Sequence, residues 1–207
     1  MKTLKLDDLK SLDQQDPLSE YREAFYLPKN TIYFDGNSLG PVPKKTLNHL
    51  NKTINEEWGS DLISSWNKAN WINLPQTLGN KIAPLIGANS GEVIVVDSTS
   101  INLFKVLTSA LRLNDNRKKI LSESTNFPSD LYILEGVTGI SNNQYECVLI
   151  EDDGNDIEKH IDSSIAVVML SHSNYKTGRI SDMKKITEYA QNKGALVVWD
   201  LSHSVGV

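Results

Sequence analysis

The segment IAVVMLSHSN at residues 165–174 decides the fold class, together with the similar segment ALVVWDLSHS at residues 195–204. In each segment an apolar run without polar alternation ends in a cluster of polar residues. Strands that are apolar throughout are buried on both faces, which is the situation in a parallel sheet covered by helices on either side. The two segments therefore predict an α/β fold with a mostly parallel sheet flanked by helices.

The same alternation of strands and helices begins near residue 92. The patterns predict further strands at Glu92–Val96, Lys119–Leu121 and Glu146–Ile150, and helices at Ser98–Leu111, Pro128–Gly136 and residues 182–193. Gly194 is placed to cap the last of these helices. The inward-facing residues of that helix are predicted to be Met183, Ile186 and Ala190.

The N-terminal part has a different, largely helical pattern. Residues 1–28 are amphipathic, with Leu4, Leu6, Leu9 and Leu12 on one side, and residues 35–41 have the composition of an exposed turn. From Pro43 a helix is expected with one apolar stripe of Leu47, Leu50, Ile54 and Trp58, and a further helix covers about 74–87. Pro84 is expected to kink or shorten that helix.

Composition excludes several classes of protein. The 207 residues are 39% hydrophobic and 23% charged, which is typical of a globular chain rather than a disordered one. The net charge of −5 argues against a dedicated nucleic-acid or anionic-membrane partner. We find no signal peptide, membrane span or zinc motif, and Cys147 is the single cysteine. A cytoplasmic protein is expected. Because Val207 closely follows a buried strand without a closing helix, we expect a truncated chain, the alternative being a compact five-stranded domain.

Polar residues follow each apolar strand, at the edge where open α/β sheets bind ligands. These clusters are Asp97–Ser100, Ser124–Asp130, Ser171–Asn174 and Asp200–His203. In the first cluster, three consecutive hydroxyl residues at a helix start exceed the needs of one cap. They predict a phosphate held by Thr99 and Ser100. Neither a GxGxxG nor a GxxxxGK[ST] motif is present, which favours a phosphorylated cofactor other than a nucleotide.

Asp200 ends a buried strand, where a carboxylate would stay ionised beside a cationic ring nitrogen. His203 could orient Asp200 or bind a ligand, and Phe127 could stack on a planar ring. Each residue also has a purely structural alternative: Asp200 could cap the next turn, His203 could have a structural role, and Phe127 could pack in the hydrophobic core. His172, Asp200, His203 and Asp97 could instead form the divalent-metal site of a hydrolase. This alternative is disfavoured, because the sequence lacks two histidines at helical metal-ligand spacing and lacks clustered carboxylates.

Five motifs together resemble the kynureninase family of fold-type-I, pyridoxal-phosphate-dependent hydrolases. They are GNSLG at 36–40, DSTSINLFK at 97–105, NFPSD at 126–130, SHSNYKTG at 171–178 and WDLSHSVG at 199–206. The resemblance is collinear and runs from about residue 25 to the end of the chain. It implies hydrolysis of L-kynurenine, or its 3-hydroxy analogue, to anthranilate or 3-hydroxyanthranilate and L-alanine in tryptophan catabolism.

The resemblance also implies a role for individual residues. Thr99 and Ser100 would hold the cofactor phosphate, and Asp200 would pair with the pyridine nitrogen. Phe127 would stack on the ring. The other implied cofactor contacts are Pro128, Ser129, Asp130, Ser171 and His203, and the loop with Asn37 and Ser38 resembles the substrate-facing loop of the family.

The Schiff-base lysine of the family lies beyond this sequence. Lys105, Lys118, Lys119 and Lys176 do not occupy a family-matching position. We therefore expect residues 1–45 to form an N-terminal helical segment with the substrate-facing loop. Residues 46–207 would form part of the large cofactor-binding domain, truncated before the small domain and inactive alone. The resemblance implies a homodimer for the full-length enzyme. Two alternatives stay open: another fold-type-I enzyme such as a cysteine desulfurase, although Cys147 is on a predicted strand, and a non-catalytic remnant or interaction module.

Overall fold

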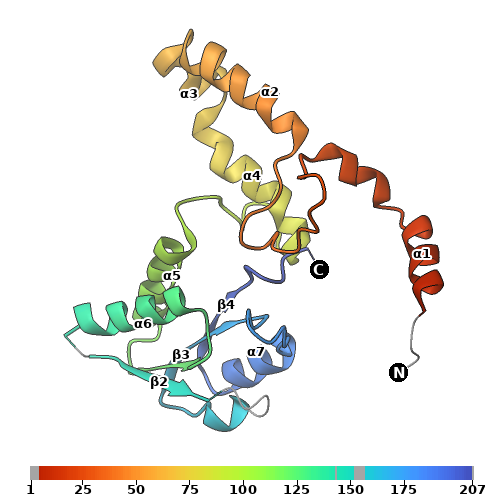
Figure 1. The fold of residues 1–207 in the computed structure, drawn as a ribbon. Coiled ribbons are helices and arrows are strands. Elements are labelled where there is room, and N and C mark those ends of the chain that lie inside the picture. The colour runs from red at the N-terminus through yellow and green to blue at the C-terminus, as the bar shows by residue number, and fades with distance from the viewer. Residues whose placement is uncertain (1–4, 143, 152–156, 207) are drawn as a thin grey trace. The chain divides into compact units, whose positions relative to one another are not determined.

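The computed structural model describes residues 5–142, 144–151 and 157–206. The chain divides into two compact units, Met1–Leu74 and Pro75–Val207, and each is described separately below (Figure 1). Within the described ranges, no helix combines the length and apolar character needed to cross a membrane.

The second unit is built on a four-stranded parallel sheet. Its strands are β1 (Lys119–Glu123), β2 (Glu146–Ile150), β3 (Ile165–Ser171) and β4 (Leu196–Asp200), in the spatial order β2-β1-β3-β4. Every strand pair in the sheet is parallel. The parallel α/β fold expected from the apolar strands is therefore confirmed.

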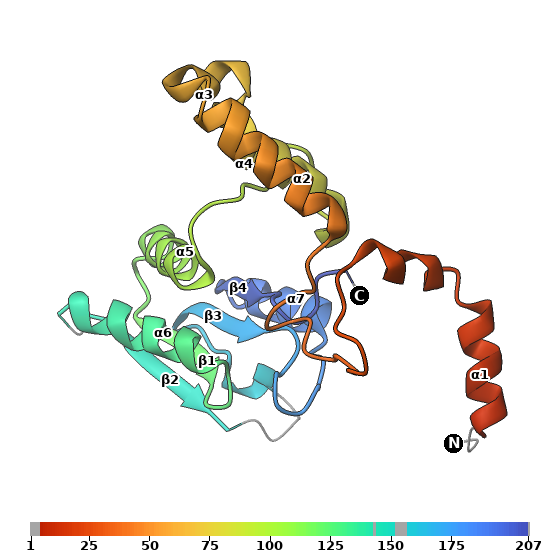
Figure 2. The same ribbon diagram turned by 45° about the horizontal axis from the view of Figure 1, so that its top comes forward.

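Helices cover both faces of this sheet, as Figures 1 and 2 show. Helices α5 (Thr99–Leu113) and α6 (Pro128–Ile140) bury Leu107 and Leu134 on one face, against Ile120 and Val167 of the strands. The opposite face is covered by α7 (Met183–Asn192) and the short 3₁₀ helix η6 (Ile157–His160). The central strand β3 is buried from Ile165 to Leu170, which explains its uninterrupted apolar sequence.

The strand predicted at Glu92–Val96 is absent, and this prediction was wrong. The segment runs beside α4 (Leu74–Ile82), which continues into the 3₁₀ helix η5 (Ala83–Ile86). Its backbone bonds to that helix rather than to a strand: Val95 N donates to Pro75 O at 3.1 Å, and Gln76 Nε2 donates to Val93 O at 3.0 Å. A β-rich sequence forms a strand only where a neighbouring strand offers its backbone. The described part of the chain offers none here.

Two smaller predictions also need correction. Helix α6 does not end at Gly136, because both Gly136 and Gly139 keep helical φ angles and the first left-handed residue is Asn142, at φ 54°. Met183 begins α7 and is 36% exposed rather than inward-facing. Gly194, with φ 78°, does end α7 in the left-handed conformation that favours glycine.

The first unit is a series of short helices. These are α1 (Leu6–Gln15), η1 (Ser19–Ala24), α2 (Lys44–Lys52), the π-helical turn η2 (Thr53–Trp58), η3 (Leu62–Ser64), α3 (Ser65–Lys68) and η4 (Trp71–Asn73). The π-helical turn is held from both sides. Trp71 Nε1 donates to the Glu57 carboxylate at 2.8 Å, and the Ser65 hydroxyl donates to the Glu57 carbonyl. Ser65 is the one buried residue among those described in this unit.

Candidate functional site

The carboxyl ends of three strands bring the predicted polar clusters to one edge of the second unit. Ser171 and Asp200 are partners in the β3–β4 register, and His172 N donates to Asp200 O at 2.9 Å. Glu123 ends β1, and the turn after it leads to Phe127 and α6. This is the edge at which open α/β sheets bind ligands.

Two carboxylates, Asp130 and Asp200, lie together at this edge. Both line a cavity of about 350 Å³ that Thr99 also lines and whose walls are otherwise largely apolar. Asp200 Oδ1 accepts hydrogen bonds from Ser202 N at 2.8 Å and from Ser202 Oγ at 2.5 Å, which orients the carboxylate. Asp130, in the first turn of α6, is 1% exposed. Its Oδ2 has no hydrogen-bond partner among the described residues.

The electrostatics of this pair suit a cation. Burial of Asp130 and the negative charge of the neighbouring Asp200 raise the pKa of Asp130 from 3.8 to about 6. An unpartnered buried oxygen and two adjacent carboxylates are both costly unless the two carboxyl groups share a proton, as the raised pKa of Asp130 allows, or a positively charged donor lies beside them. A protonated ring nitrogen supplies one N–H and one positive charge, so the residues present fit such a group.

The start of helix α5 lies at the same cavity. Ser98 is the N-cap residue, and its Oγ accepts a long hydrogen bond of 3.5 Å from Ile101 N. The first turn of a helix leaves its N–H groups without intrahelical acceptors, and the Ser98 hydroxyl satisfies only that of Ile101. The N–H groups and hydroxyls of Thr99 and Ser100 are thus suited to an anion such as a phosphate.

The loop before α5 is held by two side chains. Asn102 Nδ2 donates to Val96 O at 2.8 Å, which pins the loop to the helix. Asp97 has a φ of 44°, a left-handed conformation that side chains other than glycine seldom adopt, and it forms an ion pair with Lys105. The same ion pair engages Lys105, the lysine nearest in sequence to the phosphate-type site.

Phe127 lies in a group of three rings. Its ring centroid is 5.0 Å from that of Tyr175 in an edge-on arrangement and 5.9 Å from that of His203. The backbone of Phe127 is fixed by Asn126, whose Oδ1 accepts from Phe127 N at 2.8 Å and from Ser171 Oγ at 2.6 Å. Phe127 itself is 36% exposed, so part of its surface is accessible to a ligand.

The structure brings most of the predicted site residues into two groups at the same sheet edge, one at the cavity and one around the Phe127 ring. Thr99, Asp130 and Asp200 share the cavity, while Phe127 with His203 forms the ring cluster to which Asn126 links Ser171. The remaining residues of the Phe127–Asp130 loop belong to α6, where Pro128 is the first residue and Ser129 Oγ is 3.4 Å from Asp130 Oδ1.

Asn37 and Ser38 lie in the first unit and not in this edge of the second. They occupy a turn in which Ser38 N donates to Asp35 O at 3.2 Å. Tyr33 closes the same turn, because its hydroxyl lies 2.6 Å from Leu39 O. Their assignment to a substrate-facing loop stays a prediction.

Three site residues were missed by reasoning from the sequence: Asn126, Tyr175 and His172 in its structural role. His172 Nδ1 lies 2.9 Å from Ser204 Oγ and so ties the loop after β3 to the turn after Asp200. Asn126 and Tyr175 both belong to motifs recognised in the sequence, NFPSD and SHSNYKTG. Their positions were therefore visible, whereas their contacts across about 50 residues of sequence were not.

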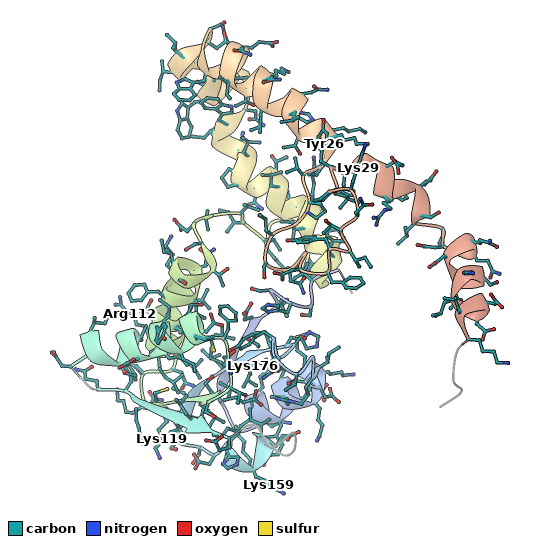
Figure 3. The ribbon with its side chains drawn as sticks, viewed as in Figure 1. Tyr26, Lys29, Arg112, Lys119, Lys159 and Lys176 are labelled. Carbon is teal, nitrogen blue, oxygen red and sulfur yellow. The ribbon has the colours of Figure 1, made fainter. Side chains whose placement is uncertain are left out.

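Two further observations bear on the alternatives. In the described parts of the chain, no three His, Cys, Asp or Glu side chains gather closely enough to hold a metal ion. Lys176 lies on the loop after β3, with its ammonium 5.5 Å from the Tyr175 ring centroid, whereas Lys119 begins β1 at the opposite end of the sheet (Figure 3).

Comparison with known families gives the decisive match. The family model described as "Aminotransferase class-V" matches residues 32–207, which is most of the chain. The chain belongs to the class-V aminotransferase family. The residues that match the family model include the Asn37–Ser38 turn and the entire sheet-edge site.

Curated relatives of this class-V protein are kynureninases. The kynureninase of Pseudomonas fluorescens is 48% identical over 204 residues, which are 97% of this chain and 49% of that protein. The kynureninase of Burkholderia pseudomallei strain K96243 is 46% identical over 95% of this chain and 48% of its own length. The chain thus spans about half the length of the curated relatives it matches. The resemblance inferred from the five motifs is confirmed.

Solved structures with similar folds share little sequence with the chain. A C-DES variant with glycine covalently linked to its pyridoxal phosphate cofactor superposes with a TM-score of 0.74 at 16% identity, over 88% of this chain and 50% of that one. The apo cysteine desulfurase from Thermococcus onnurineus NA1 gives 0.61 at 22% identity, over 97% and 48%. These matches confirm the fold of the large domain and carry no argument about the reaction.

Proposed function

We propose that the full-length protein containing this chain is a kynureninase that uses pyridoxal phosphate. It would hydrolyse L-kynurenine, 3-hydroxykynurenine or both to alanine and the corresponding anthranilate. The observation that carries the proposal is the identity of 46–48% to kynureninases over 95–97% of the chain, a span that includes most of the chain and so most of the sheet edge. The matches to the C-DES variant and the cysteine desulfurase, at 16 and 22% identity, show the fold alone and so lend the desulfurase alternative no support of their own.

The cofactor would be held by residues from four elements. The first turn of α5, with Thr99 and Ser100, would bind the phosphate, because helix N-termini favour dianions. Asp200, oriented by Ser202, would accept the N–H of the pyridine nitrogen, with Asp130 adding a second negative charge beside it. Phe127 would cover one face of the ring, with His203 and Ser171 close by.

When bound, pyridoxal phosphate supplies an electron sink for the negative charge that develops at the substrate Cα. Asp200 contributes by keeping the ring nitrogen protonated, since an adjacent carboxylate favours the charged form. Phe127 and the apolar walls of the cavity exclude water from the ring, which strengthens that ion pair. We also propose that Asn37 and Ser38 face the substrate and that residues 46–207 are part of the large domain. The full-length enzyme would act as a cytoplasmic homodimer.

The proposal is tested with the purified full-length protein supplemented with pyridoxal phosphate. Equal amounts of anthranilate, followed by its fluorescence, and of alanine should form from kynurenine. Cysteine should release no sulfide under the same conditions. Sulfide release with no action on kynurenine would replace the proposal by the desulfurase alternative, and failure on both substrates would favour a non-catalytic remnant. The 207-residue chain should be inactive in the same assay.

A further inference from the structure

The loop after β3 forms a closed hairpin at the edge of the site. Ser173 and Ile180 pair across it, and Asn174 N donates to Arg179 O at 2.8 Å. At its base, Ser181 N donates to His172 O at 2.9 Å. Asn174 Oδ1 accepts from the backbone N–H groups of Lys176 and Thr177, at 2.9 and 3.1 Å. Residues 172–181 therefore behave as one unit whose position depends on what holds it from outside.

An ion pair ties this hairpin to the sheet, in addition to the contact of His172 with Ser204 and the longer contacts of Asn174 Nδ2 with Thr125, at 3.4 and 3.5 Å. Arg179 Nη2 donates to both carboxylate oxygens of Glu123, at 2.8 and 2.9 Å, and Arg179 Nη1 donates to Ser181 Oγ at 3.1 Å. The Glu123 side chain is 11% exposed and that of Arg179 is 28% exposed. The planar guanidinium thus joins the shielded Glu123 carboxylate through Nη2 and the Ser181 hydroxyl through Nη1, and a lysine ammonium lacks this second donor in fixed geometry.

The hairpin carries Tyr175 to the edge of Phe127. The two ring centroids are 5.0 Å apart with an interplanar angle of 68°. The backbone of Phe127 is already fixed through Asn126, so its ring can change mainly by rotation about its side-chain bonds. Contact with the Tyr175 ring restricts that rotation, since edge-on aromatic pairs have a preferred geometry. The tilt of the Phe127 ring therefore depends on the position of the hairpin.

We propose that Glu123 and Arg179 are positioning residues of the site: their ion pair holds the 172–181 hairpin so that Tyr175 sets the tilt of the Phe127 ring. Neither residue touches the cavity that Asp130 and Asp200 line. The link to catalysis rests on the proposed function, because the ring covered by Phe127 is that of the proposed cofactor. The effect of the ion pair on the position of the hairpin does not depend on which ligand the site binds.

The test uses the full-length, cofactor-loaded protein with Glu123→Gln and, separately, Arg179→Lys. Three readouts are compared: the visible circular dichroism of the bound cofactor, kcat and KM, and the rate of tryptic cleavage after Lys176. We expect the dichroism band to weaken, kcat to fall about tenfold with KM changed less than about threefold, and cleavage to accelerate, because small misplacements of a catalytic group cost up to about 100-fold in rate.

A matched control lies on the other side of the sheet. Glu158 is 14% exposed and pairs with Lys185 at 2.7 Å, so it resembles Glu123 in burial and in distance to its partner. Glu158→Gln should lower the melting temperature by an amount similar to Glu123→Gln while leaving the dichroism band, kcat and cleavage after Lys176 unchanged. Equal effects of the two variants on the band and on kcat would overturn the proposal, since the ion pair would then act on stability alone.

Tyr175→Ala supplies a test that leaves the ion pair intact. Alone it should reproduce the kcat and dichroism changes of Glu123→Gln, and the double variant should be no worse than either single one, because both act through the same contact. Additive losses would contradict the proposal. If the unsubstituted protein binds no pyridoxal phosphate, the proposed function fails. The cleavage assay then tests separately whether the ion pair of Glu123 and Arg179 holds the hairpin. An unchanged cleavage rate in Glu123→Gln would overturn that part of the proposal.

Discussion

The two units of this chain bury their apolar side chains to very different extents. In the unit from Pro75 to Val207, residues such as Leu107, Leu134 and Val168 have no exposed surface, and helices cover both faces of the sheet. In the unit from Met1 to Leu74, the apolar stripe of α2 and η2 stays open, with Leu50 50% and Trp58 63% exposed. Burial of apolar surface is the main source of stability. Among the residues that the structure describes, the clusters of buried apolar side chains lie in the second unit.

This difference suggests different roles for the two units: the second unit supplies a rigid scaffold, and the first supplies an exposed apolar surface. The proposed cofactor site lies on the unit that has a core, where its residues can be held in fixed positions. Short helices without a core are marginal in water, and an exposed apolar stripe is typical of a surface that another part of the protein or a second subunit covers. The homodimer proposed for the full-length enzyme would supply such a surface.

The largest effect is expected from Asp200→Ala in the cofactor-loaded, full-length protein. Loss of the carboxylate leaves the ring nitrogen without its partner, so kcat should fall by about 1,000-fold or more while KM changes far less. Steady-state kinetics with kynurenine measure both constants. Near-normal turnover would show that Asp200 is not part of the active site, and would contradict the assignment of that site to the sheet edge of the second unit.

Two leucine substitutions, one in each unit, compare how much buried apolar side chains contribute to the free energy of unfolding. In the 207-residue chain, Leu107→Ala should lower the free energy of unfolding by about 3 kcal/mol, because it leaves a cavity in the core. Leu50→Ala, at a half-exposed position of the stripe, should cost less than about 1 kcal/mol. Urea denaturation measures both values. Equal costs would contradict the assignment of a core to only one unit, whereas a larger cost of Leu50→Ala in the full-length protein would show that the stripe is covered there.

The pH dependence of Asp130 gives a smaller effect. Its pKa of about 6 lies above that of an unfolded aspartate, so the folded state binds the proton more tightly. The cofactor-free protein should therefore lose stability as pH rises from about 4 to 6. Asp130→Asn removes this loss and should be more stable than the unsubstituted protein by about 1–2 kcal/mol at pH 7. Denaturation at pH 4 and pH 7 checks the sign, and a difference that does not change with pH would refute it.

The smallest effect is expected at the helix cap. Ser98→Ala removes the side-chain acceptor of Ile101 N and should cost about 1 kcal/mol, or less because that hydrogen bond is long. Asn89 N donates to Glu92 at 2.7 Å in a solvent-exposed turn, so Glu92→Ala is a control for loss of a local side-chain acceptor away from the site. A melting temperature unchanged by Ser98→Ala would show that the cap contributes nothing to α5.

Periodicity and strand chemistry predicted most of the second unit correctly. The buried run of β3 and the glycine that ends α7 are local signals, and both appear where they were expected. The failure at Glu92–Val96 has a non-local cause, because a strand needs a partner and the segment bonds to α4 instead. The stripe of α2 was predicted as an apolar face, yet the sequence alone could not say whether another surface covers it.

The site shows the same limit. Asp200 was predicted from its position at the end of a buried strand and Asp130 from the family resemblance, but their closeness becomes visible only when the end of β4 and the first turn of α6 are placed at one cavity. The ion pair of Glu123 and Arg179 joins residues 56 positions apart, which no local pattern reveals. Sequence motifs thus identify the residues of this edge, whereas the contacts that orient them come from the packing of the sheet.

Borohydride reduction of the full-length protein loaded with pyridoxal phosphate, followed by mass spectrometry of its tryptic peptides, tests most directly whether this sheet edge holds the cofactor. We expect one stoichiometric adduct, on a lysine beyond Val207, because Lys105 is engaged with Asp97 and Lys176 does not line the cavity of Asp130 and Asp200. A stoichiometric adduct on Lys105 or Lys176, or no adduct on any lysine, would contradict this expectation.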